Sequence, residues 1–286
     1  MTAQWSHCVV VGTGLLGASL AGAGKARGLF ARTTGVGRST TNLETARARR
    51  LVDDTTSHLA SAVADADLVV LATPVQTALR QLGELTDLLP AHCAVTDVGS
   101  VKAPIVAEAA RLGLSSRFLG AHPMAGKAES GAGAADVDLF RGARVVLTPD
   151  SATPESLTAA IRAMWTALDA EVVVMNAAEH DEAVAMCSHL PQMVAYALAA
   201  AADDAANRDR VLQLAAGGFR DMTRLAASDA DMWLDIITAN REPILEALSE
   251  MELALGGLQA AIEEGDETWL RAVFAKAQKL RGDLPR

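Results

Sequence analysis

The sequence lacks the features that mark secreted, membrane-spanning or nucleic-acid-binding proteins. No segment reaches the roughly 18 to 20 uninterrupted apolar residues of a membrane span, and no basic stretch at the N-terminus leads into an apolar run and a cleavage site. Basic residues are too few to balance the acidic ones, which leaves a formal net charge of -10 and argues against a broad phosphate-binding surface. We therefore expect a cytoplasmic protein that binds neither membranes nor nucleic acids.

Cysteine is also scarce, and its spacing offers no metal site. Cys8, Cys93 and Cys187 are odd in number, widely separated and flanked by apolar or small residues. Neither CxxC nor a Cys/His ligand spacing occurs. We expect three buried free thiols and no bound metal.

What is present is an alternating pattern followed by a helical one. Half of the 286 residues are hydrophobic, so a packed core is expected throughout, and the length suits a sizeable α/β domain with a smaller companion. Apolar β-type runs alternating with helical stretches predict parallel strands joined by crossover helices. The predicted strands are 7–11, 34–37, 68–72, 94–97, 118–121, 143–147 and 171–175.

The pattern changes at Asn176. Beyond it, Ala-, Leu- and Met-rich stretches at helical spacing predict helices over 177–206, 208–227, 230–258 and 266–281. Pro191 lies inside the first of them, where its missing N–H and its ring should kink the helix beside Ser188 and His189.

A glycine-rich turn follows the first predicted strand. Val9 to Val11 lead into Gly12-Thr13-Gly14-Leu15-Leu16-Gly17 and then into helical sequence, the context in which GxGxxG binds a dinucleotide. Gly12 permits a tight turn, Gly14 lets the backbone approach a pyrophosphate, and Gly17 lets helix and strand pack closely. The predicted fold is α/β: a Rossmann-type domain with a mostly parallel sheet over residues 1–175, then an all-helical domain over 176–286.

The residues after the second predicted strand favour NADP over NAD. An NAD-selective fold usually places Asp or Glu there to hold the ribose 2′-hydroxyl, but no acidic residue precedes Glu44. Arg38, Ser39 and Thr40 offer a guanidinium and two hydroxyls, which suit a 2′-phosphate. The alternative is that Arg38 stacks on the adenine and that NAD is accepted as well.

Further motifs follow the fourth and later strands. Thr73 and Pro74 resemble the segment that passes under the nicotinamide-side ribose in this superfold. The motifs TDVGSVK at 96–102 and HPMAG at 122–126 border the crevice where an open α/β sheet binds its ligand. With SHLP at 188–191, GGFRDMTR at 217–224 and DMW at 231–233, in this order, they resemble the prephenate/arogenate (cyclohexadienyl) dehydrogenase family over most of the chain.

The resemblance implies the reaction chemistry. His122 would hydrogen-bond the ring 4-hydroxyl and accept its proton as hydride leaves for the nicotinamide, and Ser100 would orient that hydroxyl. The chemistry is sound, because a neutral imidazole can take a proton near pH 7, and oxidation of the carbinol carbon lets the ring lose its carboxylate by aromatisation.

The substrate that the resemblance implies is a dicarboxylate, so an acidic protein would have to present cations to it. Arg220 and Arg224 are four residues apart, which should place them on one helical face. By resemblance Arg224 is the main carboxylate clamp and Arg220 a weaker candidate, the alternative being a solvated basic face. Ser188 and His189 would reach the substrate's side chain.

The function predicted is NADP-dependent oxidative decarboxylation of prephenate to 4-hydroxyphenylpyruvate in tyrosine biosynthesis, by a homodimer formed through the C-terminal helices. Arogenate dehydrogenase is the first alternative, and Asp181, on the same helical face as Ser188, could recognise a substrate amine. An amino-substituted prephenate, another dehydrogenase of this fold and a non-catalytic NADP-sensing module are further alternatives. Because the chain ends at Arg286, we expect no C-terminal regulatory domain.

Overall fold

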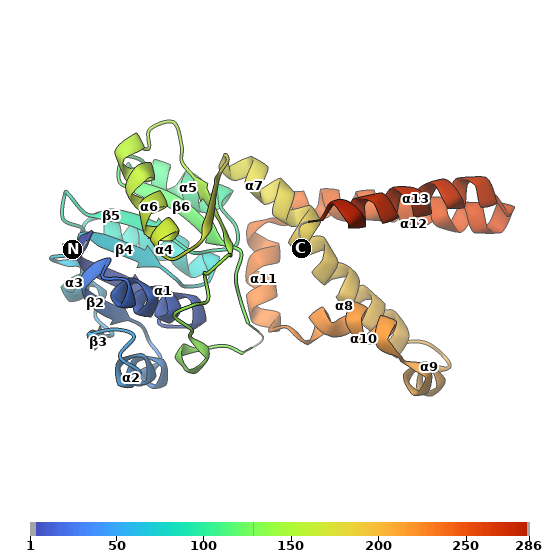
Figure 1. Cartoon of the computed structure of the whole chain (residues 1–286), viewed down its shortest axis with the longest axis horizontal. Coiled ribbons are helices and arrows are strands. Elements are labelled where there is room, and N and C mark those ends of the chain that lie inside the picture. The colour runs from blue at the N-terminus through green and yellow to red at the C-terminus, as the bar shows by residue number, and fades with distance from the viewer. Residues whose placement is uncertain (1–3, 128, 285–286) are drawn as a thin grey trace.

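The computed structural model describes residues 4–127 and 129–284. Its N-terminal part is an eight-stranded sheet in the order β3-β2-β1-β4-β5-β6-β7-β8, with helices on both faces (Figure 1). Every neighbouring pair is parallel except β6 and β7, which are antiparallel. The strands are β1 Trp5–Val11, β2 Phe30–Val36, β3 Asp54–Thr56, β4 Leu68–Leu71, β5 Ala94–Asp97, β6 Phe118–Pro123, β7 Arg144–Thr148 and β8 Glu171–Val174. The predicted α/β fold with a mostly parallel sheet is confirmed.

The sheet separates two apolar layers. Cys8 and Val10 of β1 pack in the layer that holds the helices α1 and α6, whereas Val9 and Val11 pack in the layer that holds α3, α4 and α5. A strand covered on both faces reads as a continuous apolar run, which is why β1 was visible in the sequence. The helices are α1 Leu15–Ala26, α2 Thr40–Ala48, α3 Leu59–Val63, α4 Val75–Thr86, α5 Ala103–Arg111 and α6 Glu155–Ala167.

Three strand predictions need correction. β3 was not predicted, because this three-residue edge strand is polar and Asp54 is exposed. β2 begins at Phe30, earlier than predicted. β6 continues to Pro123, so His122 lies inside this strand, opposite Val146, and not after its end, as the predicted range 118–121 implied.

After β8 the described chain is helical as far as Asp283, as predicted, but three of the four predicted helices are divided. The predicted helix 177–206 is divided by a π-helical turn, 208–227 is broken before Gly217, and 230–258 is broken at Asn240. The elements are α7 Ala177–Val184, the π turn Ala185–His189, α8 Leu190–Asp203, α9 Arg208–Leu214, α10 Gly217–Thr223, the 3₁₀ turn Arg224–Ala227, α11 Ala230–Ala239, α12 Arg241–Glu264 and α13 Glu267–Asp283.

The irregularity expected at Pro191 takes the form of the π turn. A proline cannot donate to the carbonyl four residues earlier, here that of Cys187, and the chain widens by one residue per turn just before it. The turn carries Ser188 and His189, which are half-buried and buried, respectively. It leaves Cys187 exposed, so the prediction of three buried thiols holds for Cys8 and Cys93 but is wrong for Cys187.

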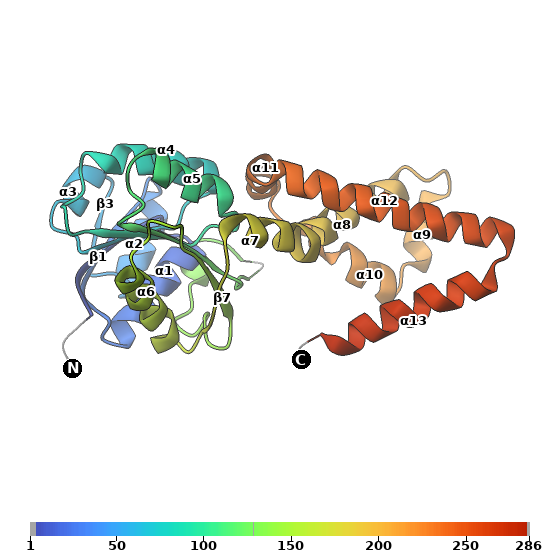
Figure 2. The same ribbon diagram turned by 90° about the horizontal axis from the view of Figure 1, so that it is seen from above.

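The helical part extends from the sheet domain as two arms, one made by α8 to α10 and one by α12 and α13 (Figure 1). α13 turns back toward the sheet domain at an angle to α12, so that the two helices form a V, as Figure 2 shows. Both helices carry large apolar side chains that are more than half exposed: Leu253, Leu255, Ile262, Phe274 and Leu280. An exposed apolar surface of this kind is typical of a protein interface.

One stretch, Ala177–Asp203, is long and apolar enough to cross a membrane by length and composition. It contains the buried polar residues His180, Asp181 and His189, and Asp181 bonds to the sheet domain. These contacts are those of a core helix in a folded protein.

Candidate active site

The carboxyl edge of the sheet arranges the predicted site residues in a fixed order. Because β2, β1, β4, β5 and β6 are neighbours and run parallel, the segments that leave these strands lie along one edge. From one end to the other, these segments carry Arg38, the glycine turn, Thr73 and Ser100, and His122 lies next in the order, at the end of β6. In open α/β sheets this edge is where ligands bind.

The glycine turn has the geometry that its motif predicts. Gly12 has φ +104°, and a Cβ there would lie 2.3 Å from the carbonyl oxygen of Ala72. A Cβ on Gly17 would lie 1.9 Å from the carbonyl oxygen of Gly12, so helix and strand are in close contact. A Cβ on Gly14 would meet nothing within 4 Å, which leaves room for an approaching ligand.

The start of α1 completes an anion site at this turn. Gly14 is its N-cap and provides no side-chain cap, so the first backbone N–H groups of the helix, including those of Leu15 and Leu16, are available to a ligand. The open space beside Gly14 and these N–H groups fit the pyrophosphate of a dinucleotide.

Two further segments lie on either side of the glycine turn along the sheet edge. Arg38 is exposed, and Ser39 caps α2 by accepting a hydrogen bond from Asn42 N at 3.2 Å, with Thr40 as the first helical residue. On the other side, Thr73 Cγ2 lies 3.0 Å from a Cβ built on Gly12. Pro74 is the N-cap of α4.

A buried chain of side chains lies at the end of β6. His122 Nδ1 is 2.8 Å from His180 Nε2, and His180 Nδ1 is 2.7 Å from Asp181 Oδ1. The two rings meet edge to face, with centroids 5.0 Å apart. All three side chains are at least nine-tenths buried, so His122 is held by the helical part although it belongs to the sheet domain.

Asp181 joins α7 to the start of α5. Its Oδ1 also accepts the N–H of Lys102 at 2.7 Å, and its Oδ2 accepts that of Ala103 at 2.7 Å. The carboxylate therefore caps α5. Since both of its oxygens have protein donors, the hypothesis that Asp181 recognises a substrate amine has no support.

The TDVGSVK motif supplies a buried ion pair next to this chain. Lys102 Nζ bonds Asp97 and donates to the carbonyl oxygen of Ala121 at 3.0 Å. Asp97 Oδ1 accepts the N–H of Ala121 at 3.1 Å. Burial lowers the pKa of Lys102, and the Asp97 carboxylate opposes that shift. The pair fixes the backbone on which His122 stands.

His189 is connected to the same cluster through Asn240, where the helix breaks between α11 and α12. Asn240 Nδ2 donates to the carbonyl oxygen of Asp181 at 2.9 Å and lies 3.0 Å from His189 Nδ1. The His189 ring packs edge-on against Trp233, with centroids 5.9 Å apart. Burial lowers the pKa of His189 to about 4, so the ring is neutral near pH 7.

His122 is also neutral. Burial, then the nearby His180 and Lys102, hold the pKa of His122 well below its usual range. A buried neutral imidazole with one nitrogen held by another residue can act as a base through the other nitrogen.

The two arginines lie apart from this buried cluster. Arg220 and Arg224 were expected on one helical face. α10 ends at Thr223, however, and Arg224 begins a 3₁₀ turn instead of continuing the helix of Arg220. Both side chains are exposed. The turn is held on α8 by Gln192, whose Nε2 donates to the carbonyl oxygen of Leu225 at 2.7 Å.

Two residues of the cluster were missed in the sequence analysis, namely His180 and Asn240. A His-Asp pair two helical turns before Ser188-His189 was the signal available for His180. Asn240 was taken as a residue within one long helix. The hydrogen bonds of its side chain join different elements, so no local sequence pattern could predict them.

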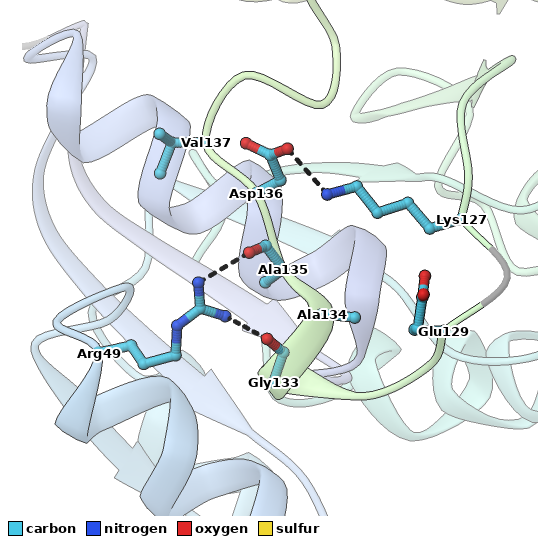
Figure 3. Close-up of a pocket in the computed structure, with 8 residues that line it drawn as sticks. All are labelled: Arg49, Lys127, Glu129, Gly133, Ala134, Ala135, Asp136 and Val137. Atoms are coloured by element: carbon cyan, nitrogen blue, oxygen red, sulfur yellow. Dashed lines mark hydrogen bonds and ion pairs between the residues drawn. The ribbon is translucent and has the colours of Figure 1, made fainter.

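A separate hollow of 520 Å³ lies between the end of α2 and the segment made by Lys127 and residues 129–137 (Figure 3). Arg49 spans it and donates to the carbonyl oxygens of Gly133 and Ala135 at 2.8 and 2.9 Å, and Lys127 pairs with Asp136 at 2.8 Å. None of the predicted site residues lines it. Arg49 fastens this segment to the end of α2, and Lys127 and Asp136 pair within the segment.

Comparison with known proteins gives matches over most of the chain. Residues 20–174 match the family model described as the nucleotide-binding domain of prephenate dehydrogenase, and residues 176–276 match the one described as its dimerization domain. Cyclohexadienyl dehydrogenase of Zymomonas mobilis is 32% identical over 97% of this chain and 95% of its own length.

Solved structures agree with these matches. Synechocystis arogenate dehydrogenase has a TM-score of 0.85 at 33% identity, covering 96% of this chain and 99% of its own. Prephenate dehydrogenase from Aquifex aeolicus, in complex with hydroxyphenyl propionate and NAD+, has a TM-score of 0.89 at 29% identity, covering 96% and 98%.

Proposed function

The chain belongs to the prephenate dehydrogenase family, and from that premise we propose that it converts prephenate to 4-hydroxyphenylpyruvate by NADP-dependent oxidative decarboxylation in tyrosine biosynthesis. As a member of this family it is an oxidoreductase with a nucleotide-binding domain. The observation that carries the proposal is the place of His122. It is buried at the carboxyl end of β6, two strands along from Thr73, with Nδ1 held by His180.

His122 is the base of the reaction. The pKa of His122, held low by burial, keeps the imidazole ready to accept the proton of the ring 4-hydroxyl. Bound nicotinamide supplies the acceptor for the hydride that leaves C4. The C4–O bond becomes a carbonyl, the bond from C1 to its carboxylate then breaks with release of CO₂, and the electron pair enters the ring. Aromatisation returns a proton to the 4-oxygen and makes the sequence effectively irreversible.

Ser100 and four residues of the helical part complete substrate binding. Ser100 follows β5 and orients the 4-hydroxyl beside His122. Ser188 and His189, on the π turn, reach the substrate's side chain, where a neutral His189 can hydrogen-bond a keto group without adding charge. Arg224 binds a carboxylate, and Arg220 assists more weakly.

The cofactor extends along the sheet edge from Arg38 to Thr73. Arg38, with Ser39 and Thr40 at the start of α2, binds the 2′-phosphate of NADP, since an arginine fork and a helix N-terminus both favour a dianion. Pro74 and Thr73 lie under the nicotinamide-side ribose. NAD, which the Aquifex aeolicus structure contains, is the competing cofactor.

Residues 1–175 form the cofactor-binding domain and residues 176–286 the substrate and dimerisation domain of a cytoplasmic homodimer. The match of residues 176–276 to a dimerization domain supports this assembly, as do the exposed apolar side chains of α12 and α13. We expect the molecular mass measured in solution to be twice that of one chain.

The deciding experiment measures reduced nicotinamide formation with prephenate and with arogenate, each with NADP and with NAD. A rate with prephenate and NADP that exceeds the other three by at least about tenfold supports the proposal. A higher rate with NAD keeps the reaction and removes the NADP assignment. No rate in any of the four assays refutes the function.

Arogenate is the second candidate substrate. The similarity to Synechocystis arogenate dehydrogenase favours it. The two substrates share the ring, the 4-hydroxyl and the ring carboxylate, so the His122 chemistry serves both. A rate with arogenate alone would make the product tyrosine itself.

A further inference from the structure

The hydrogen-bonded chain behind His122 has a direction. Asp181 accepts the backbone N–H groups of Lys102 and Ala103, so it acts only as an acceptor. The proton in the contact between His180 and Asp181 must therefore reside on His180 Nδ1.

The same direction of donation holds for the hydrogen bond between His180 and His122. In a neutral imidazole with its proton on Nδ1, Nε2 carries a lone pair and accepts. The 2.8 Å contact between His180 Nε2 and His122 Nδ1 therefore takes its proton from His122. That leaves His122 Nε2 with a free lone pair.

We propose that His180 and Asp181 are positioning residues for His122: the carboxylate sets the tautomer of His180, and His180 in turn sets the tautomer of His122. The effect is to make Nε2 the basic atom of His122 and to fix the plane of its ring. The inference rests on the proposed function only for the identity of the proton donor.

Placing one imidazole between carboxylate and base has a chemical consequence. An aspartate directly on His122 Nδ1 would raise the pKa of His122 and keep a proton on it at rest. Through His180, the same carboxylate orients the ring without that effect. The other charged or titratable groups facing His122 are Lys102, paired with Asp97, and His189.

Burial and the neighbouring His180, Lys102 and His189 lower the pKa of His122, so its ring is neutral until the substrate supplies a proton. Two carboxylates, Asp97 and Asp181, and the amine of Lys102 are buried nearby. In the proposed reaction, Nε2 of His122 takes the proton from the substrate. His122 then still donates from Nδ1 to His180, so the hydrogen bonds do not rearrange during proton transfer.

Two substitutions at His180 separate its two contacts. His180→Gln can place its amide oxygen near the position of Nε2 and keep an acceptor for His122. His180→Asn reaches only the position of Nδ1 and keeps the donor to Asp181 alone. We expect kcat to fall by less than about tenfold in His180→Gln. In His180→Asn we expect a fall of about 100-fold or more, which is the size of the rate loss when a general base no longer functions.

KM for substrate and the cofactor Kd should change by less than about threefold in both variants, because His180 touches neither ligand. His92→Gln, at an exposed histidine, is the matched control. Equal kcat values for the two His180 variants, or a loss that appears in KM, would overturn the proposal.

A spectroscopic test does not depend on activity. Long-range ¹H–¹⁵N correlation spectra of the full-length protein distinguish the two histidine tautomers, and the loss of one signal in His122→Gln assigns His122 among the six histidines. We expect Nδ1–H for both His122 and His180 at pH 8. An Nε2–H form of His122, or a doubly protonated His180, overturns the inference. Nδ1–H tautomers in a protein inactive in all four assays support the inference and refute the proposed function.

Discussion

Asp235 of α11 accepts the backbone N–H of Val75, at the start of α4, with a distance of 2.6 Å. Its second oxygen accepts the N–H of Gln76 at 3.1 Å. Asp181 does the same at the start of α5. Two carboxylates of the helical part thus cap two helices that begin at the carboxyl edge of the sheet. These contacts fix the orientation of the helical part relative to the site.

Asp235→Ala should lower the free energy of unfolding by about 1–2 kcal/mol, the usual worth of an N-cap carboxylate. Urea unfolding measures it. Asp87→Ala is the control, because Asp87 is an exposed carboxylate at the opposite end of α4, where it opposes the helix dipole. Equal losses in the two variants would show that the cap contributes nothing.

His122→Asn should lower kcat by about 10²–10⁴-fold while cofactor affinity stays nearly unchanged, because the base is lost and the glycine turn is intact. Steady-state kinetics and a cofactor titration measure the two effects. His58→Asn, at an exposed histidine, should retain the wild-type rate. An unchanged rate in His122→Asn would exclude His122 as the base.

Arg224→Ala should raise the KM for prephenate by about 10- to 100-fold, since a hydrogen bond to a charged group contributes about 1.5–3 kcal/mol. Arg220→Ala should have a smaller effect. Arg210→Ala, on α9 and also exposed, controls for general loss of positive charge. If Arg224→Ala and Arg210→Ala give the same KM, Arg224 is part of a solvated basic face.

Arg38→Ala should weaken NADP binding by about 10- to 100-fold and leave NAD binding within about threefold, because only NADP carries the 2′-phosphate. Fluorescence titration with both cofactors measures the ratio. Arg47→Ala, exposed at the other end of α2, is the control. A parallel loss for both cofactors would indicate stacking of Arg38 on the adenine.

The pKa of His189, lowered to about 4 by burial, makes folding stability depend on pH. Above about pH 6.5 the ring is neutral in both folded and unfolded chains. As the pH falls toward 4, the unfolded chain binds a proton that the folded chain does not, so stability falls, by up to about 3 kcal/mol for this group. The depressed pKa of His122 acts in the same direction.

Urea unfolding at several pH values between 4 and 8 measures this loss, and His189→Gln should show a shallower decline than the wild type. The expected difference in slope corresponds to one proton. Identical slopes would mean that His189 is already protonated in the folded protein.

The glycine turn and the sheet with apolar layers on both faces could be predicted, because the sequence signals for both are local. Gly12, Gly14 and Gly17 act within one strand–turn–helix unit, and a strand buried on both faces reads as an apolar run wherever it occurs. β3 escaped prediction because an edge strand of three polar residues has neither signal. The helix breaks at Asn240 and Thr223 also escaped, because Ala- and Leu-rich sequence has helical periodicity on both sides of each break.

The sequence by itself determined the Rossmann-type architecture and, through ordered motifs, the family. The tertiary structure alone decided which groups surround His122. His122 and His180 are 58 residues apart in the chain and on different parts of the fold, and Asp181 meets the start of α5 only where α7 packs against it. A tautomer depends on the partner of each nitrogen, and such partners come together only when the two parts of the chain pack against one another.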